Sequence, residues 1–223
     1  MAETIPIERG RTRLLDIGCG CGIIGIYCLI EKGASFVTFN DILDEMVSVT
    51  RGNVDRQVKR GRILDGQQAY LTGSYNHIRQ EVIAAHSLIE FNIPQLPMDL
   101  VNEEYRRKVE TNPVQRSFRR GGADGLEIVR EFLGWYAGLV RPRPDAVILL
   151  SSFLGRSRIA DAIQNNGLSW RILDETRVGL RTILAEAAER LSTDEKERND
   201  RSLARNDDGE WTKTLLTVLL QGS

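Results

Sequence analysis

The residue types that could do chemistry gather early in the chain. Residues 14–22 read Leu-Leu-Asp-Ile-Gly-Cys-Gly-Cys-Gly, and Asp41 follows at the end of a second apolar run. Glycines at alternate positions let the backbone of a turn approach a ligand closely, because no side chain stands in the way. An acidic side chain about twenty residues further on is suited to accept both ribose hydroxyl hydrogens of a nucleotide. The spacing therefore predicts a nucleotide-sized pocket.

The elements that must position these residues can be read from the surrounding pattern. The apolar run Arg13–Ile17 predicts a strand that delivers Asp16 to the glycine-rich turn. A helix is expected to start near Gly22 and to return the chain to a second strand, Phe36–Phe39. That strand ends at Asn40-Asp41, so the turn and the second acidic residue should lie close together.

The spacing of the glycines favours one nucleotide over another. Nicotinamide-binding turns read G-x-G-x-x-G, whereas this chain has Gly18, Gly20 and Gly22, and then Gly25. An acidic residue two positions before G-x-G-x-G, here Asp16, resembles motif I of the class I S-adenosylmethionine-dependent methyltransferases. A nicotinamide enzyme and a glycine-rich turn without a ligand remain the alternatives.

This resemblance implies a fold and a cofactor. The fold is α/β, a Rossmann-like and mostly parallel sheet of seven strands in the order 3-2-1-4-5-7-6, with the last strand antiparallel and helices on both faces. The cofactor is S-adenosylmethionine, with Asp16 near its methionine amine, Asp41 on its ribose and Ser74 near its adenine. The residues implied in cofactor binding are Asp16, Gly18, Cys19, Gly20, Gly22, Asp41, Ile42 and Ser74.

A second motif ends the fourth expected strand, Ser87–Phe91, where the chain reads Asn92-Ile93-Pro94-Gln95. It resembles motif IV of methyltransferases that modify planar nitrogens, where an Asn-Pro-Pro-aromatic turn aims the nitrogen lone pair at the methyl group. We expect Asn92, Pro94 and Gln95 to line the acceptor pocket. For Asn92 the alternative is a cap on the following turn. Gln95 could bond the substrate or face solvent.

Departures from that motif bear on the substrate. Ile93 replaces the first proline and Gln95 replaces the aromatic residue, so the turn looks more like the catalytic module of methionine S-methyltransferases. Gly121–Leu126 and Leu139–Pro142 resemble the HemK-like enzymes and the methyltransferase small domain. Only a dozen residues precede the first strand, so we do not expect a domain that docks release factors.

The acceptor hypotheses follow from these departures. A small molecule, with an amide or amino nitrogen or another soft nucleophile, is the expected substrate. Protein-glutamine or RNA methylation is the first alternative, and a catalytically inactive, cofactor-binding partner subunit is the second.

Composition narrows the class of protein. The chain has 223 residues, of which 41% are hydrophobic and 27% charged, and its net charge is −1. This predicts one globular domain over residues 1–223 and no global attraction to nucleic acid. No apolar run is long enough to cross a membrane, and the N-terminus has no signal-peptide pattern, so we expect a cytoplasmic protein.

The remaining elements alternate as an α/β fold requires. Residues 92–123 have no clean period, and 180–210 looks like an inserted helical segment rich in mixed charge. That insertion is either a solvated helical hairpin or a lid or dimer arm over the substrate. Further strands are expected at 69–72, 146–150, 169–174 and 213–220, and helices at 44–61, 74–85, 126–139, 156–165 and 180–191.

Three weaker candidates remain. The cluster of basic and aromatic residues in 103–120 could grip an anionic small molecule, could bind single-stranded RNA, or could be solvated charge. Cys19, Cys21 and Cys28 lack a nearby fourth metal ligand, so we interpret them as small side chains in a tight turn. Both histidines are expected at the surface. The cluster comprises Tyr105, Arg106, Arg107, Lys108, Arg116, Phe118, Arg119 and Arg120, and the histidines are His77 and His86.

Overall fold

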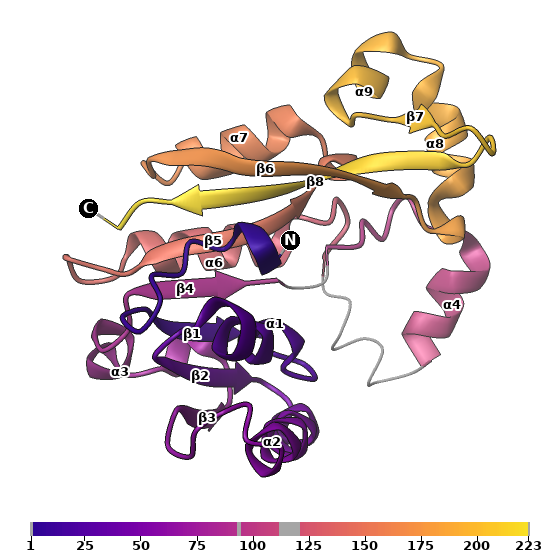
Figure 1. Ribbon diagram of the computed structural model, residues 1–223. Coiled ribbons are helices and arrows are strands. Elements are labelled where there is room, and N and C mark those ends of the chain that lie inside the picture. Colours follow the sequence, from indigo (N-terminus) through magenta and orange to yellow (C-terminus); the bar gives the residue numbers. More distant parts are fainter. Residues whose placement is uncertain (1, 93–94, 112–120, 223) are drawn as a thin grey trace. The chain divides into compact units, whose positions relative to one another are not determined.

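The computed structural model describes residues 2–92, 95–111 and 121–222 (Figure 1). The chain divides into two compact units. Unit 1 comprises Met1–Asn92, Leu139–Ile148 and Leu219–Ser223, and unit 2 comprises Ile93–Gly138 and Leu149–Val218.

The strands follow the expected order. They are β1 (Arg13–Ile17), β2 (Phe36–Asp41), β3 (Gln68–Thr72), β4 (Leu88–Phe91), β5 (Asp145–Ser151), β6 (Trp170–Gly179), β7 (Ala204–Arg205) and β8 (Trp211–Leu220). Hydrogen bonds join them in the order β3-β2-β1-β4-β5-β8-β6, and the additional short strand β7 pairs with β8. This confirms the Rossmann-like α/β fold, with one strand more than expected.

In unit 1 the strands are parallel and their ends coincide. Ile17 at the end of β1 pairs with Asn40 on one side and with Phe91 on the other. Asp41 at the end of β2 pairs with Thr72 at the end of β3. The residues that follow these strands therefore meet at one edge of the sheet, where ligands of open α/β sheets bind. Strands β1, β2 and β4 are largely buried, as at Leu14, Leu15, Val37 and Ile89, whereas β3 is only half-buried.

The helices of unit 1 are short, with the exception of α2. Helix α1 (Ile23–Tyr27) continues as a π-helical turn, η2 (Cys28–Lys32), which ends at Gly33 with a φ of 72°. Helix α2 spans Asp44–Lys59 and matches the expectation. Two further short elements, η3 (Tyr75–His77) and α3 (Gln80–Ala84), follow β3.

The single helix expected over 74–85 is wrong. Ile78 and Arg79 have extended backbone angles, with ψ of 127° and 143°, and they separate η3 from α3. The Tyr75 ring packs edge-on to Phe91 with 5.6 Å between centroids, so a tertiary contact fixes this segment as a tight turn. Packing of this kind routinely overrides local helical propensity.

Unit 2 holds β6 and most of β8, and these two strands run in opposite directions in Figure 1. The stretch 92–123, which shows no clean period in the sequence, contains a helix, α4. Six of its nine residues are charged, so the sequence offers few apolar positions from which to recognise the helix. The helical elements are α4 (Glu103–Thr111), α6 (Glu127–Ala137), η4 (Ser152–Leu154), α7 (Arg156–Gln164), η5 (Thr182–Leu184), α8 (Ala185–Ser192) and α9 (Glu195–Asp200).

The inserted segment 180–210 contributes to a hydrophobic core inside unit 2. Leu184, Ala187 and Ala188 of this segment are buried together with Phe153, which follows β5. The interpretation as a wholly solvated hairpin is therefore wrong, because one face of the segment is apolar and covered. The expected helix over 180–191 becomes regular only at Ala185, after the 3-10 turn η5.

Candidate functional site

The glycine turn after β1 has the backbone that glycine alone adopts easily. Gly18, Gly20 and Gly22 have φ angles of 72°, 56° and 78°. The Gly18 and Cys19 N–H groups both donate to the Asn40 carbonyl, at 2.8 and 3.0 Å. A Cβ atom added at Gly20 would meet no atom within 4 Å. The turn is thus fixed from below and open above Gly20.

Asp41 joins this turn to the loop after β2. Its Oδ2 accepts a hydrogen bond from the Gly20 N–H at 3.0 Å, and its Oδ1 accepts one from the Leu43 N–H at 3.0 Å. Each carboxylate oxygen has about two lone pairs, so both can accept a further hydrogen. Next to it, the Ile42 side chain is 62% exposed and offers an apolar surface. These groups fit a ribose and an adjoining flat base.

The end of β3 completes the same edge. The Gly73 N–H donates to the Asp41 carbonyl at 2.9 Å. The Asn40 side-chain amide donates to the carbonyls of Leu71 and Gly73 at 3.2 and 3.0 Å. Ser74 follows, and its side chain caps nothing in η3. Asn40 is a part of the site that sequence reasoning missed, although it stands next to Asp41.

Asp16 lies beneath the turn and is only 1% exposed. Its Oδ2 accepts a hydrogen bond from the Gly25 N–H of α1 at 3.1 Å. A Cβ atom on Gly25 would lie 2.8 Å from that oxygen and 2.3 Å from the Phe39 ring, so this contact requires glycine. Burial raises the pKa of Asp16 to about 6, and a hydrogen bond from Glu90 opposes that rise.

Glu90 is a site residue that sequence reasoning missed. It stands beside Asp16 in the register of β1 and β4 and is 3% exposed. Burial raises its pKa well above the usual value, and the Asp16 charge raises it further. The signal was visible in the sequence, since Glu90 is the one charged residue in the buried strand Leu-Ile-Glu-Phe.

Asn92 directly follows β4 in unit 1, so it lies at the same strand edge as Asp41. It is half-buried, and its side chain forms no hydrogen bond with the described part of the chain. Ile93 and Pro94 lie outside the described residues. Pro94 as a pocket residue, and the capping alternative for Asn92, therefore stay predictions.

Gln95 has a structural role that the sequence did not predict. Its Oε1 accepts a hydrogen bond from the Ser151 N–H at 3.0 Å, and its Nε2 donates to the Leu149 carbonyl. Both ends of the amide are thus taken up by the backbone at the end of β5. Gln95 therefore positions the chain here, and because Nε2 carries a second N–H, its contact with a substrate stays a prediction.

The Gly-Gly-Ala-Asp-Gly segment supports the stretch that follows Gln95. A Cβ atom on Gly121 would lie 2.4 Å from the Leu96 carbonyl oxygen, so the two backbones approach as closely as glycine allows. Gly122 accepts a hydrogen bond from the Met98 N–H at 3.0 Å. Asp124 accepts one from the Leu126 N–H at 3.0 Å at the start of α6. This motif is therefore structural within unit 2.

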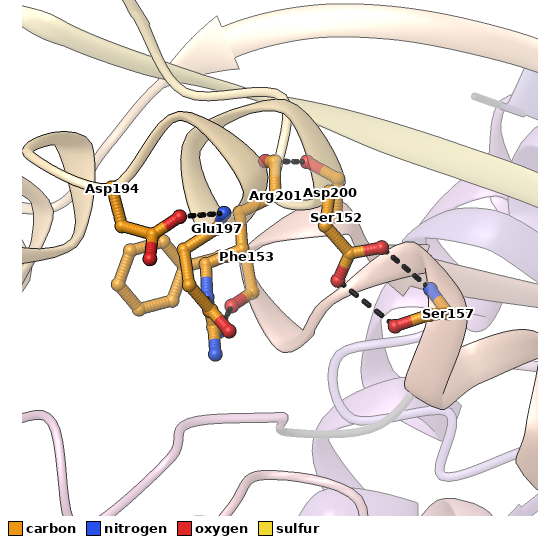
Figure 2. A network of polar contacts seen from close by, with 7 residues as sticks. All are labelled: Ser152, Phe153, Ser157, Asp194, Glu197, Asp200 and Arg201. Carbon is orange, nitrogen blue, oxygen red and sulfur yellow. Dashed lines mark hydrogen bonds and ion pairs between the residues drawn. The ribbon is translucent and has the colours of Figure 1, made fainter.

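The insertion is fastened to the residues after β5 (Figure 2). The Arg201 side chain, 3% exposed, donates to Glu197 Oε2 at 2.8 Å and to the Phe153 carbonyl. The Asp200 carboxylate points at Ser157 and accepts from its N–H and its hydroxyl, at 2.8 and 3.1 Å. These bonds hold α9 against η4 and the start of α7.

The described part of the basic cluster is largely paired. Arg106 donates to the Met98 carbonyl at 2.9 Å, and Lys108 lies 2.6 Å from Glu104. This favours the solvated-charge interpretation over an anion-binding one. Four members of the cluster, Arg116, Phe118, Arg119 and Arg120, lie outside the described residues.

The histidines divide between surface and core. His77 is exposed, as expected. His86 is buried, which corrects the expectation: its Nδ1 donates to the Val82 carbonyl and its Nε2 bonds the Thr38 hydroxyl, each at 2.7 Å. Burial lowers its pKa. It serves as a link between α3 and β2.

The cysteines are all free, and Cys19 and Cys28 are buried. Burial raises the pKa of Cys19 to about 12, so it is a packed thiol and not a thiolate ligand. Within residues 2–92, 95–111 and 121–222, no group of three or more His, Cys, Asp or Glu could hold a metal ion. No helix in these ranges is long and apolar enough to span a membrane.

Comparison with known proteins bears on the fold. No family model matches the chain, and no curated protein sequence matches it significantly. Solved structures do match. Precorrin-6y C5,15-methyltransferase from Geobacter metallireducens has a TM-score of 0.52 at 7% identity, covering 100% of this chain and 85% of that one. The chain has the Rossmann-like fold of such methyltransferases.

Two other solved structures have a similar fold. One is a proposed methyltransferase in complex with the Trm112 methyltransferase activator from Haloferax volcanii, with a TM-score of 0.52 at 15% identity over 98% of this chain and 86% of that one. The other is a proposed S-adenosylmethionine-dependent methyltransferase from Streptococcus mutans, with a TM-score of 0.55 at 8% identity over 95% of this chain and 45% of that one.

Proposed function

We propose that this protein is an S-adenosylmethionine-dependent methyltransferase that acts on a small molecule. The observation that supports this most is the open space above Gly20, bordered by Asp41 with unused lone pairs on both oxygens. The methyltransferase fold adds to it. A redox dinucleotide would use a similar acidic residue, but the glycine spacing of the turn favours S-adenosylmethionine.

The residues of unit 1 fit this cofactor. Asp41 would accept the ribose hydroxyls, Ile42 would cover one face of the adenine, and Ser74 would bond the adenine amino group. Asp16 would act on the methionine amine from beneath the turn. Gly18, Cys19 and Gly22 would contribute backbone only, since their turn is already fixed by Asn40 and Thr50. The cofactor would supply an electrophilic sulfonium methyl group.

Asn92 would bind and orient the acceptor. Its amide has no partner in the described part of the chain, so its oxygen can accept a hydrogen from an acceptor nitrogen. Such a contact works by positioning and by stabilising the charge that develops on the acceptor. A thioether acceptor would need no proton removed. In either case the mechanism needs no histidine as a general base, so neither histidine is assigned a role in it.

The cofactor proposal is tested with matched glycine variants. Gly20→Ala and Gly10→Ala both place a Cβ at a positive φ, 56° and 73°, and neither Cβ meets an atom within 4 Å. Both should therefore cost about 1 kcal/mol in stability. Only Gly20→Ala should abolish heat on titration with S-adenosylhomocysteine. Equal binding by the two variants would contradict a cofactor lying over Gly20.

The acceptor class is tested with labelled S-adenosylmethionine and a cell extract. After incubation the extract is separated into small molecules, protein and RNA, with Asn92→Ala as the control enzyme. The proposal predicts label in the small-molecule fraction that the variant does not transfer. Label in protein or RNA would overturn the substrate class, and no transfer at all would favour an inactive partner subunit. A single domain, association through 180–210 and a cytoplasmic location stay predictions.

A further inference from the structure

The carboxyl groups of Asp16 and Glu90 form a buried pair inside unit 1. They are neighbours in the register of β1 and β4, and they are 1% and 3% exposed. Asp16 has two partners, the Gly25 N–H and the Glu90 carboxyl. The second oxygen of Glu90, Oε2, is buried and has no hydrogen-bonding partner in the described chain.

An unpaired oxygen of this kind indicates which group carries a proton. A buried carboxylate with an unsatisfied oxygen is costly, whereas a neutral carboxyl with one unsatisfied carbonyl oxygen costs far less. Two carboxyl groups in contact cannot both be ionised at neutral pH. Asp16 keeps the donor from Gly25, so the negative charge is better stabilised on Asp16 and the proton on Glu90.

We propose that Glu90 is a positioning residue which, as a protonated carboxyl, donates to Asp16 and keeps Asp16 charged and oriented beneath the cofactor turn. The effect of Glu90 on cofactor binding rests on the proposed function, because Asp16 is expected near the cofactor amine. The protonation of Glu90 itself does not rest on that function. The raised pKa values of both groups agree with it.

The other groups that face the pair support the same state. Asp41 approaches from β2, and its charge raises the pKa of Asp16. Cys19 in the turn and Cys28 in η2 both have pKa values raised to about 12 by burial and by the Asp16 charge, so they stay neutral. The charge of Lys32, at the end of η2, lowers the pKa of Cys28 and so opposes part of that rise. No cation compensates the pair within the described residues, so the charge of Asp16 is stabilised by the hydrogen bonds from Gly25 and Glu90.

The first test reads the proton directly and needs no cofactor. Infrared spectra of the folded protein at pH 7 are compared between the wild type and Glu90→Gln. We expect the wild type to show the C=O stretch of a protonated carboxyl group that the variant lacks. Identical spectra in that region would overturn the proposal, because Glu90 would then be ionised.

The second test follows S-adenosylhomocysteine affinity between pH 5 and pH 8. Wild-type affinity should fall as the pH drops through about 6, where Asp16 takes up a proton. Glu90→Gln retains a donor, so its affinity at pH 7 should stay within about threefold of the wild type. Glu90→Ala removes the donor, so its affinity should fall about tenfold at pH 7 and its midpoint should move to higher pH.

The outcomes separate the two proposals. A pH profile in Glu90→Ala that matches the wild type would overturn the positioning role. An equal loss of affinity in Glu90→Gln would also overturn the positioning role, because binding would then require the charge of Glu90 and not a donated hydrogen bond. If the wild type binds no S-adenosylhomocysteine, the proposed function fails, and the infrared result alone decides whether Glu90 carries the proton.

Discussion

Units 1 and 2 use polar residues in opposite ways. In unit 1, the residues picked out by their spacing lie at one strand edge and keep capacity for a ligand: Asp41 holds two backbone N–H groups and still has free lone pairs. In unit 2, buried or half-buried polar side chains bond the backbone and hold the fold together, as Gln95 does at the end of β5 and Arg201 does at η4. Spacing therefore reveals a site made of backbone turns more readily than one made of side chains.

Asp41→Ala should give the largest effect and break the unit 1 side of this comparison. It removes the bonds to Gly20 and Leu43 together with the proposed ribose contacts. Affinity for S-adenosylhomocysteine should fall about 300-fold, or about 3 kcal/mol. Calorimetry measures this, with Asp44→Ala as control, because the Asp44 side chain accepts a hydrogen bond from the Thr72 hydroxyl and none from the glycine turn. A similar loss in both variants would show a general disturbance of the loop.

Asn92→Ala separates binding from chemistry within unit 1. Turnover should fall about 100-fold, the scale of losing one positioned polar group at a reacting centre. Affinity for S-adenosylhomocysteine should change less than about threefold, because Asn92 is not expected to touch the cofactor. Initial rates and calorimetry on the same preparation give both values. If affinity falls as much as turnover, Asn92 belongs to the cofactor pocket.

Arg201→Ala tests whether the polar groups of unit 2 serve the fold. Its guanidinium is buried against Glu197 and the Phe153 carbonyl, so removal should lower the free energy of unfolding by about 2 kcal/mol. The exposed neighbour Arg198→Ala should change it by less than about 0.5 kcal/mol. Denaturant unfolding measures both. Cofactor affinity below the transition should be unaffected, and its loss would place the cofactor site partly on the insertion.

Glu90→Gln should produce the smallest effect and sharpen the account of unit 1. The wild type must keep Glu90 protonated above its ordinary pKa of 4.5, whereas glutamine needs no proton. The folded wild type therefore binds more protons than its unfolded state, and its stability falls as the pH rises above about 4.5. The variant should gain about 1.5 kcal/mol over the wild type between pH 4.5 and pH 6. A constant difference across that range would contradict a protonated Glu90.

The sequence predicted the strands of unit 1 well, whereas the strand expected at 169–174 extends over Trp170–Gly179 and the short strand β7 was not expected. The first strand was expected at Arg13–Ile17 and is found there, and β2, β3 and β4 differ by at most two residues at an end. The break at Ile78 was not predictable, because it depends on the packing of Tyr75 against Phe91, and these two residues are far apart in the sequence. Tertiary contacts of this kind have no local sequence signal.

The candidate site shows the same limit. Gly18, Gly20 and Asp41 could be found from spacing because strand geometry brings them together. The structural role of Gln95 was not predicted, because its partners are backbone atoms of Leu149 and Ser151, which only the folded chain reveals. His86 was expected at the surface and is buried. Its partners, the Thr38 hydroxyl in β2 and the Val82 carbonyl in α3, come together around it only in the folded chain.

The central claim is that the turn after β1 binds an adenosyl sulfonium cofactor, and parallel calorimetric titrations of the wild-type chain test it most directly. S-adenosylhomocysteine and NADH are each titrated into the same folded sample, whose folding is verified by a cooperative thermal transition. We predict saturable heat with S-adenosylhomocysteine and none with NADH. Heat with NADH alone, or with neither compound, would contradict the claim.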